Sequence, residues 1–481
     1  MRQVVILHGW SDDSRSFEPL AGWLASRGYQ AVPLWLGDYI SMQDDVGVED
    51  VARRMEAVLR DKMSAGVVAT EFDLIVHSTG GLVARRWIAD HYAGDISACP
   101  AKRLVMLAPA NFGSPLAHLG QSMLGRLVKG WDNWFHTGKR MLKQLELASP
   151  FQWDLAKRDL FAGPGGASGP IYGPGGIPTF VLAGSHPYTD LLRQAVNEDG
   201  GDGTVRVAAA NLNARGATLD YTRDGAPTLT EWPLRQHLPI AFVTLPDRTH
   251  GSIIHPESVD IPVAPGFFPS LGDLLLEALG CDTDGAYGEL VVRWTGHCET
   301  TARLGREAQF RAQVFQGAGG TDEGFFHQYM QMVVRVVDDY GQEVSDYFLE
   351  FSGPNDDPGD QATVHFQQTT LKNVHLYGDD HARRCLFMDR TDLMTGFYGA
   401  IAPGVEKVLR MSLSANPPGD NVRYFEDYNT GAEGSLTLHL EDEKDAAKRW
   451  LRRNTTHLVE VVIPRVPGAG VFKLRAYPQV G

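Results

Sequence analysis

A serine, an aspartate and a histidine lie in this chain in the order that a nucleophilic hydroxyl on a sheet edge requires. Ser78 ends the segment DLIVHS (73–78), and the helical pattern TGGLVARRW follows at once. A strand that turns sharply into a helix at a serine lifts the hydroxyl off the sheet and points the next backbone N–H groups into the same space. The usual G-x-S-x-G pattern has Val76 in place of its first glycine. Whether Ser78 is a nucleophile therefore depends on an acid and a histidine elsewhere in the chain.

A serine hydroxyl needs a histidine to take its proton and an acid to orient that histidine. After an elbow of this kind the acid should come next in the chain and the histidine last. The loop 110–115 contains no carboxylate, whereas NEDGGDGTV (197–205) offers Glu198, Asp199 and Asp202. Glycines on both sides of Asp202 allow a tight turn that aims one carboxylate inward, so we predict Asp202 as the acid. Its alternative role is a turn residue or calcium ligand, since Asp and Gly crowd such loops.

The general base is predicted to be His250, just past the apolar run IAFVTLP (240–246). Two other histidines are rivals: His255 lies five residues further on, and His237 precedes the run, at its wrong end. Position therefore favours His250, which could take the serine proton. Asp247 is close in sequence but is better explained as a loop residue that supports the site.

Two backbone N–H groups should stabilise the oxyanion that forms when the serine attacks. Thr79, the residue after the nucleophile, supplies one of them at the start of its helix. The other is predicted from the loop after the first strand, where Gly9 lets the chain turn closely and leaves the Trp10 N–H free to point inward. His8, before that glycine, is predicted to be a structural support.

The candidate residues need a sheet to position them, and six apolar runs in the first 280 residues alternate with helical patterns. The runs are VVIL (4–7), YQAVPLWL (29–36), DLIV (73–76), RLVMLAP (103–109), TFVLAG (179–184) and IAFVTLP (240–246). This alternation predicts an α/β fold with a doubly wound, mostly parallel sheet and helices on both faces. Ligands in such sheets bind beyond the carboxyl ends of the strands, where the candidate residues fall.

A cap insertion is predicted at about 116–177, where the strand pattern is interrupted. Two or three amphipathic helices there carry Trp131, Trp134 and Phe135, followed by the Gly- and Pro-rich segment 162–176. Apolar helices inserted between strands commonly cover an active site, and aromatic caps suit apolar substrates. Ordinary helical packing without a role in the site is the alternative.

A second domain is predicted because the spacing of apolar residues along the sequence changes after a linker at 281–288. Residues 289–481 contain many short alternating or β-branched runs separated by turn residues, among them GELVVRW, AQFRAQVF and ATVHFQ, which predicts an all-β, sandwich-like domain. A hairpin is expected around residues 338–341. The region shows no catalytic constellation, so its predicted role is packing or peripheral contact with a lipid surface or a protein.

Composition fits a globular protein, with 43% hydrophobic and 21% charged residues. The net charge of −15 disfavours nucleic acid as a partner, and the sequence indicates no particular oligomeric state.

The four cysteines are scattered, which argues against a zinc site or a disulfide framework. No signal peptide or membrane-spanning run is recognised, so a cytoplasmic location is expected; export without an N-terminal signal stays compatible.

Residues 1–280 resemble the α/β-hydrolase superfamily, in particular its lipase-like branch, which includes bacterial lipases and glycosylphosphatidylinositol-inositol-deacylase-like enzymes. The shared motifs are HGWSDDSRSF, VHSTGGLVAR, APANFGSPLA, GDGTV and THGSI. The resemblance implies that Phe112, Gly113 and Ser114 line or support an acyl pocket. It also implies that the family's first two strands are missing and that Val76 tunes the elbow.

The predicted activity is hydrolysis of a carboxylic ester, as in a lipase, esterase or phospholipase, through an acyl-enzyme. Ser78, Asp202 and His250 would form the triad, and no metal or organic cofactor is required. The same triad could serve an amidase, a thioesterase or an acyltransferase, because fold does not fix function. A catalytically silent binding protein on a hydrolase scaffold is a further alternative.

Overall fold

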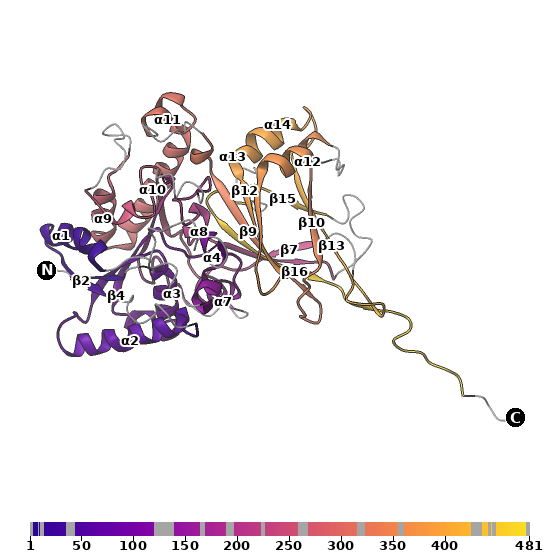
Figure 1. Ribbon diagram of the computed structural model, residues 1–481, viewed down its shortest axis with the longest axis horizontal. Coiled ribbons are helices and arrows are strands. Elements are labelled where there is room, and N and C mark those ends of the chain that lie inside the picture. Colours follow the sequence, from indigo (N-terminus) through magenta and orange to yellow (C-terminus); the bar gives the residue numbers. More distant parts are fainter. Residues whose placement is uncertain are drawn as a thin grey trace. The chain divides into compact units, whose positions relative to one another are not determined.

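The computed structural model describes residues 3–7, 9, 14–34, 44–119, 139–163, 169–188, 197–222, 227–257, 268–314, 323–354, 360–424, 435–440, 444 and 449–477. The chain divides into two compact units, neither of them continuous in sequence (Figure 1). The first contains Met1–Arg215, Trp232–Gln331 and Arg453–Thr456, and the second contains Gly216–Glu231, Met332–Arg452 and His457–Gly481.

A six-stranded parallel sheet forms the centre of the first unit. Its strands, in spatial order, are β2 (Gln30–Leu34), β1 (Gln3–Leu7), β3 (Phe72–His77), β4 (Ala101–Leu107), β5 (Thr179–Gly184) and β8 (Ala241–Leu245). Every neighbouring pair is parallel. All six apolar runs are therefore strands, as predicted. The register aligns His77 with Leu107 and Leu107 with Leu182, so the loops that follow β3, β4 and β5 leave from one edge.

Helices cover both faces of this sheet. On one face, α1 (Glu18–Ser26), α9 (Leu271–Leu279) and α10 (Asp284–Leu304) share a buried apolar core with the strands. On the other side in Figure 1 lie α2 (Val48–Ser64) and α3 (Gly80–His91). The α2 carboxylate Glu56 accepts a hydrogen bond from Trp87 Nε1 of α3 at 2.6 Å, which ties the two helices together. No helix among the described residues is long and apolar enough to cross a membrane.

The remaining elements of the first unit are short. They are Ser14–Phe17 (η1), Ile96–Ala98 (η3), Leu116–Leu119 (α4), Lys139–Leu145 (α6), Pro150–Asp159 (α7), Val207–Ala210 (α8), Ser252–Ile254 (η6), Ala308–Val314 (α11) and Glu323–Phe326 (η7). Helices α4, α6 and α7 lie within the insertion predicted at 116–177. Residues 120–138, which include Trp131, Trp134 and Phe135, lie outside the described residues.

The prediction of strands directly after the linker is wrong. GELVVRW lies in helix α10, which begins inside the linker expected at 281–288, and AQFRAQVF is largely helix α11. The two adjacent valines in GELVVRW favour a strand locally. The buried residues Tyr287, Leu290 and Trp294, however, are three and four residues apart, which is the spacing of one helix face. Thr283 caps the helix, because its side chain accepts a hydrogen bond from the Ala286 N–H at 3.2 Å.

The second unit is built on β-sheets, which confirms the β character predicted for the C-terminal region. One sheet has the order β11 (Leu371–Leu376), β12 (Arg383–Asp389), β9 (Tyr329–Asp338), β16 (Thr456–Ile463), β6 (Arg215–Asp220) and β7 (Thr228–Glu231). A second has the order β10 (Tyr347–Ser352), β13 (Leu409–Ala415) and β15 (Leu436–Leu438), with both pairs antiparallel. A two-stranded ladder joins β14 (Val422–Arg423) to β17 (Val466–Pro467).

The expected hairpin around residues 338–341 forms at the turn itself, where an antiparallel bridge joins Val337 to Glu343 and the Gly341 N–H, at φ +79°, donates to the Asp338 carbonyl. It does not extend further, because β9 and β10 belong to different sheets. One local expectation in this unit is wrong. The segment ATVHFQ is helical: Gln361–His365 is α12, and the π-helical turn Phe366–Thr370 follows it. Further helical turns occur at Arg390–Asp392 (α13), Leu393–Phe397 and Tyr398–Ala400 (α14).

The four cysteines, Cys99, Cys281, Cys298 and Cys385, are buried and form no disulfide with one another. Burial raises the pKa of Cys99 to about 12, and it also raises the pKa of Cys281 and Cys298. A thiol of pKa about 12 is about 0.01% thiolate at pH 8, and only the thiolate attacks disulfide reagents. We therefore expect negligible reaction of the native protein with an aromatic disulfide reagent at pH 8 and release of four thiols in guanidinium. Rapid stoichiometric reaction of the native protein would contradict this burial.

Candidate active site

Ser78 stands directly after β3 in a strained backbone conformation, with φ +54°. A side chain in this left-handed region costs about 1–2 kcal/mol, so it persists only where neighbours hold it. Its N–H donates to the Leu107 carbonyl at 3.1 Å, and its own carbonyl accepts from the N–H groups of Gly81 and Ala110. The elbow is thus fixed to the end of β4 on both sides, and α3 begins two residues later.

His250 faces this serine from the loop after β8. Its Nε2 lies 3.0 Å from Ser78 Oγ, and its Nδ1 lies 2.8 Å from Asp202 Oδ2. Because an ionised carboxylate only accepts, Nδ1 carries the proton and Nε2 is left to accept from the serine hydroxyl. The backbone adds a third connection, since the His250 N–H donates to the Asp202 carbonyl at 3.0 Å. All three side chains are buried.

Asp202 is aimed by its own turn. Its Oδ1 accepts from the N–H groups of Thr204 and Val205 at 2.9 and 2.7 Å, which leaves Oδ2 for the histidine. Gly203 makes the turn with φ +90°, a conformation that favours glycine. The sequence prediction of a tight glycine-flanked turn that presents one carboxylate therefore agrees with the observed geometry.

The rival residues lie elsewhere. Glu198 holds the Arg206 guanidinium through two hydrogen bonds of 2.7 and 2.8 Å. His237 is exposed, and the His255 N–H closes a turn onto the Ser252 carbonyl. Asp247 lies 3.8 Å from the Arg248 guanidinium, which suits the supporting loop role expected for it.

Of the two predicted oxyanion donors, Thr79 lies within the described residues and Trp10 does not. Thr79 is buried, directly follows Ser78 and precedes α3, and no described residue accepts from its N–H. Its place between Ser78 and α3 is compatible with the donor role, which stays a prediction. Trp10 and His8 lie outside the described residues, so the second donor stays a prediction.

Gly9 brings the loop after β1 against the elbow. A Cβ at this position would lie 2.7 Å from Ser78 Cβ, closer than real contacts allow, and 3.1 Å from the His77 carbonyl oxygen, which is a tight contact. We expect Gly9→Ala to displace the elbow and to lower kcat by up to about 100-fold, since small misplacements of reacting groups cost about this much. The comparison is Gly22→Ala in α1, where a Cβ meets nothing within 4 Å. Equal kcat values for the two variants would contradict the expectation.

The loop predicted to line an acyl pocket contacts the scaffold at each described position. The Phe112 N–H donates to the Ala209 carbonyl at 2.9 Å, and its ring lies 5.4 Å from the Arg85 guanidinium carbon. Ser114 Oγ donates to the Thr204 carbonyl at 2.6 Å, which links this loop to the turn that holds the acid. These contacts show a support for the Asp202 turn; an acyl-pocket role for Phe112 stays a prediction.

Sequence reasoning missed a buried ion pair behind the elbow. Arg85 of α3 and Asp159 of α7 are both fully buried and share two hydrogen bonds of 2.8 and 3.0 Å. Burial lowers the pKa of the Arg85 guanidinium, but the charge and hydrogen bonds of Asp159 more than offset it and raise that pKa overall. Arg85 also donates to the Asn111 carbonyl, and Tyr172 donates to Asp159. The pair fixes α3 against α7.

His77 is a second residue that sequence reasoning missed. Its Nε2–H donates to the His250 carbonyl at 3.0 Å, and the two rings lie 4.7 Å apart. It therefore steadies the loop that carries the base. The available signal was its position immediately before Ser78, at the end of a strand otherwise made of apolar residues and one aspartate.

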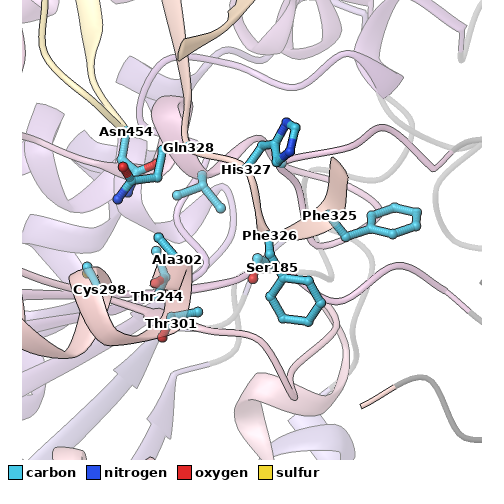
Figure 2. Close-up of a pocket in the computed structure, with 12 residues that line it drawn as sticks. Ser185, Thr244, Cys298, Thr301, Ala302, Phe325, Phe326, His327, Gln328 and Asn454 are labelled. Atoms are coloured by element: carbon cyan, nitrogen blue, oxygen red, sulfur yellow. The ribbon is translucent and has the colours of Figure 1, made fainter. Parts of the chain in front are cut away.

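A separate pocket lies beside the acid loop in the first unit (Figure 2). Ser185 after β5 and Thr244 of β8 meet Thr301 of α10 there, and Gln328 and Asn454 add amide groups. The triad residues do not line it. Its lining is about equally polar and apolar, with two phenylalanines at one side, and the pocket is too small to hold an acyl chain.

The chain can be compared with known proteins in sequence and in fold. No protein-family model matches the chain, and no curated protein matches its sequence. Among solved structures, phospholipase PlaB from Legionella pneumophila is 24% identical, with all of this chain and 98% of that chain covered and a TM-score of 0.76. Its complex with thio-NAD gives the same identity and coverage and a TM-score of 0.77. This likeness shows the fold: the chain has the α/β-hydrolase fold with a C-terminal β domain, as predicted.

Proposed function

We propose that this chain is a serine hydrolase that cleaves carboxylic esters of lipids, with phospholipids as the leading substrate class. The observation that carries the proposal is the hydrogen-bonded series from Ser78 Oγ through His250 to Asp202, with atom separations of 3.0 and 2.8 Å. The lipid class is supported by the full-length fold likeness to a protein described as a phospholipase. Neither an amide, a thioester nor an acyl acceptor has comparable support.

Acylation starts with attack of Ser78 Oγ on the ester carbonyl carbon, while His250 Nε2 takes the hydroxyl proton. Asp202 faces the opposite ring nitrogen and stabilises the imidazolium that forms. The carbonyl oxygen becomes an oxyanion, which the Thr79 N–H and, by prediction, the Trp10 N–H stabilise. When the tetrahedral intermediate collapses, the alcohol or lysolipid leaves with the proton from Nε2, and the acyl group stays on Ser78.

Deacylation repeats the sequence with water as the nucleophile. His250 Nε2 takes a proton from the water as its oxygen attacks the acyl carbon, and the same donors hold the new oxyanion. Collapse then breaks the bond to Ser78 Oγ, which recovers its proton from the imidazolium. The products are one fatty acid and free enzyme, so the cycle balances with water as the only co-reactant.

The proposal is tested by a substrate panel on the purified full-length chain, with Ser78→Ala as the blank. The panel contains phosphatidylcholine, lysophosphatidylcholine, triacylglycerol and chromogenic esters of short and long acyl chains, beside matched amide and thioester analogues. We expect fatty acid release from phosphatidylcholine at a rate above that from triacylglycerol, and none from either lipid by the blank. Turnover of the thioester or amide without ester turnover would replace the proposal by one of those activities.

A nicotinamide dinucleotide is a second candidate, as a ligand that the reaction does not consume. The specific observation is that the full-length structural relative was solved in complex with thio-NAD. We propose that NAD raises the melting temperature of this chain in a thermal shift experiment, while nicotinamide alone does not. An unchanged melting temperature with millimolar NAD would remove this candidate and leave the esterase proposal intact.

A further inference from the structure

Two buried tyrosine rings lie against glycines on either side of Asp202 in the sequence. A Cβ on Gly203 would overlap the ring of Tyr188. A Cβ on Gly200 would overlap the ring of Tyr329, and Gly200 also has φ +73°. The backbone conformation of Gly200 and the closeness of the ring therefore both require glycine. Each ring rests on the main chain of the turn that presents the acid.

Tyr329, the first residue of β9, is held through its hydroxyl and through its backbone. Its hydroxyl donates to the Gly324 carbonyl at 2.7 Å, and its own carbonyl accepts from the Asn454 N–H at 2.7 Å. Asn454 has φ +49°, a left-handed conformation that asparagine adopts more readily than most residues. The Asn454 carbonyl accepts from Asn211 Nδ2 at 2.7 Å, directly after α8. The ring is thus a fixed support for Gly200.

Helix α8, which follows the Asp202 turn, is attached to the same group of residues. The Val207 N–H at its start donates to the Gly200 carbonyl at 2.8 Å. Thr456 Oγ1 donates to the Ala208 carbonyl at 2.9 Å and accepts from Gln331 Nε2 at 3.0 Å. Thr456 and Gln331 are fully buried, so these polar atoms are satisfied by one another and not by solvent. All of these residues belong to the first unit.

We propose that Tyr329 is a positioning residue that holds the Asp202 carboxylate against His250. The inference rests on the proposed function, because the ring acts on the same triad. Both N–H groups that hold Asp202 Oδ1 belong to the turn itself. The position of Oδ2, 2.8 Å from His250 Nδ1, therefore depends on the main chain of the turn. Without the ring, Gly200 gains conformational freedom and the turn loses its fixed place.

The expected effect of removing the ring is smaller than that of removing the acid. Loss of the acid's charge lowers kcat by about 10⁴-fold, because the histidine tautomer is no longer fixed. A misplacement of reacting groups by about 1 Å costs about 100-fold. We therefore expect Tyr329→Leu to lower kcat by about 100-fold. KM should change by less than about threefold, because the lost interaction acts where the imidazolium forms, in the transition state.

Three further substitutions separate positioning from folding. Tyr329→Phe keeps the ring, loses only the hydroxyl, and should keep kcat within about threefold of wild type. Tyr92→Leu removes another buried tyrosine of the first unit, whose hydroxyl donates to Glu56 at 2.9 Å. It should lower the melting temperature but leave kcat within about twofold. If Tyr329→Leu does not fold, Thr456→Val replaces it; this variant loses one hydrogen bond to α8 and should lower kcat about fivefold.

A double-variant cycle with Asp202→Asn tests whether the ring acts through the acid. In that background we expect Tyr329→Leu, or Thr456→Val in its place, to lower kcat by less than about a further threefold, because the carboxylate is gone. Initial rates with a chromogenic ester and rates of fluorophosphonate labelling are measured on the purified full-length proteins. The same loss in both backgrounds, or a well-folded Tyr329→Leu protein with wild-type kcat, would overturn the inference. A wild type that neither hydrolyses esters nor reacts with the fluorophosphonate would overturn the proposed function itself and the inference with it.

Discussion

Ser78→Ala is expected to lower kcat on the preferred ester by about 10⁶-fold while the protein stays folded. Removing the nucleophile of a hydrogen-bonded triad costs about as much as removing the triad, because the histidine and aspartate act only through it. The substitution also removes the one hydroxyl that His250 Nε2 reaches among the described residues. Initial rates with a chromogenic ester and a phospholipid, together with far-ultraviolet circular dichroism and a melting temperature, measure the effect.

The matched control for this variant is Ser64→Ala, at an exposed serine in the last turn of α2. It makes the same chemical change far from the elbow and should leave kcat within a factor of two, an allowance of about 0.4 kcal/mol. The kcat of Asp202→Asn should lie between those of Ser64→Ala and Ser78→Ala, about 10⁴-fold below wild type, because an amide no longer fixes the histidine tautomer. A Ser78→Ala protein with more than a few per cent of wild-type kcat would contradict the proposed mechanism.

Asp159→Ala is expected to lower the free energy of unfolding by about 3–5 kcal/mol, a large fraction of the stability of an ordinary domain. The substitution leaves the fully buried Arg85 guanidinium without its carboxylate, and an uncompensated buried charge is strongly destabilising. Tyr172 would lose its acceptor as well. Urea denaturation followed by tryptophan fluorescence measures the change.

Two comparisons show whether this cost comes from the buried charge. Arg303→Ala, at the end of α10, removes one partner of an exposed pair with Glu307 and should cost less than about 1 kcal/mol. Arg85→Met combined with Asp159→Leu removes both charges and should cost less than the sum of the single substitutions. A loss below about 1 kcal/mol for Asp159→Ala would mean that the pair does not hold α3 against α7.

The candidate site could be predicted from sequence because its parts lie at strand ends in a fixed chain order. Six apolar runs predict the strands of the sheet. Ser78, Asp202 and His250 each lie after one of these apolar strands. The order of the elements then selects one acid and one base from several candidates. The structure places Glu198 against the Arg206 guanidinium and leaves His237 exposed, whereas Asp202 and His250 are hydrogen-bonded to each other.

The supports of the site and the edges of the domains could not be predicted in the same way. Arg85 and Asp159 are 74 residues apart, and nothing in either local sequence reveals that α3 and α7 meet. His77 donates to a carbonyl 173 residues away, a contact fixed only by the folded sheet. Helix α10 was mistaken for a strand because Val291 and Val292 favour β-structure locally, whereas its buried face follows the helical period. Strands β6 and β7 join a sheet of the second unit from within the first 280 residues.

Covalent labelling with a fluorophosphonate tests the central claim, that Ser78 Oγ is an activated nucleophile. The reagent phosphonylates an activated serine with loss of fluoride, and unactivated hydroxyls react far more slowly. We expect one adduct per native chain, mapped by peptide mass spectrometry to Ser78, much slower labelling of Asp202→Asn and none of Ser78→Ala. A well-folded wild-type protein that stays unlabelled, or an adduct on any other residue, would contradict the account.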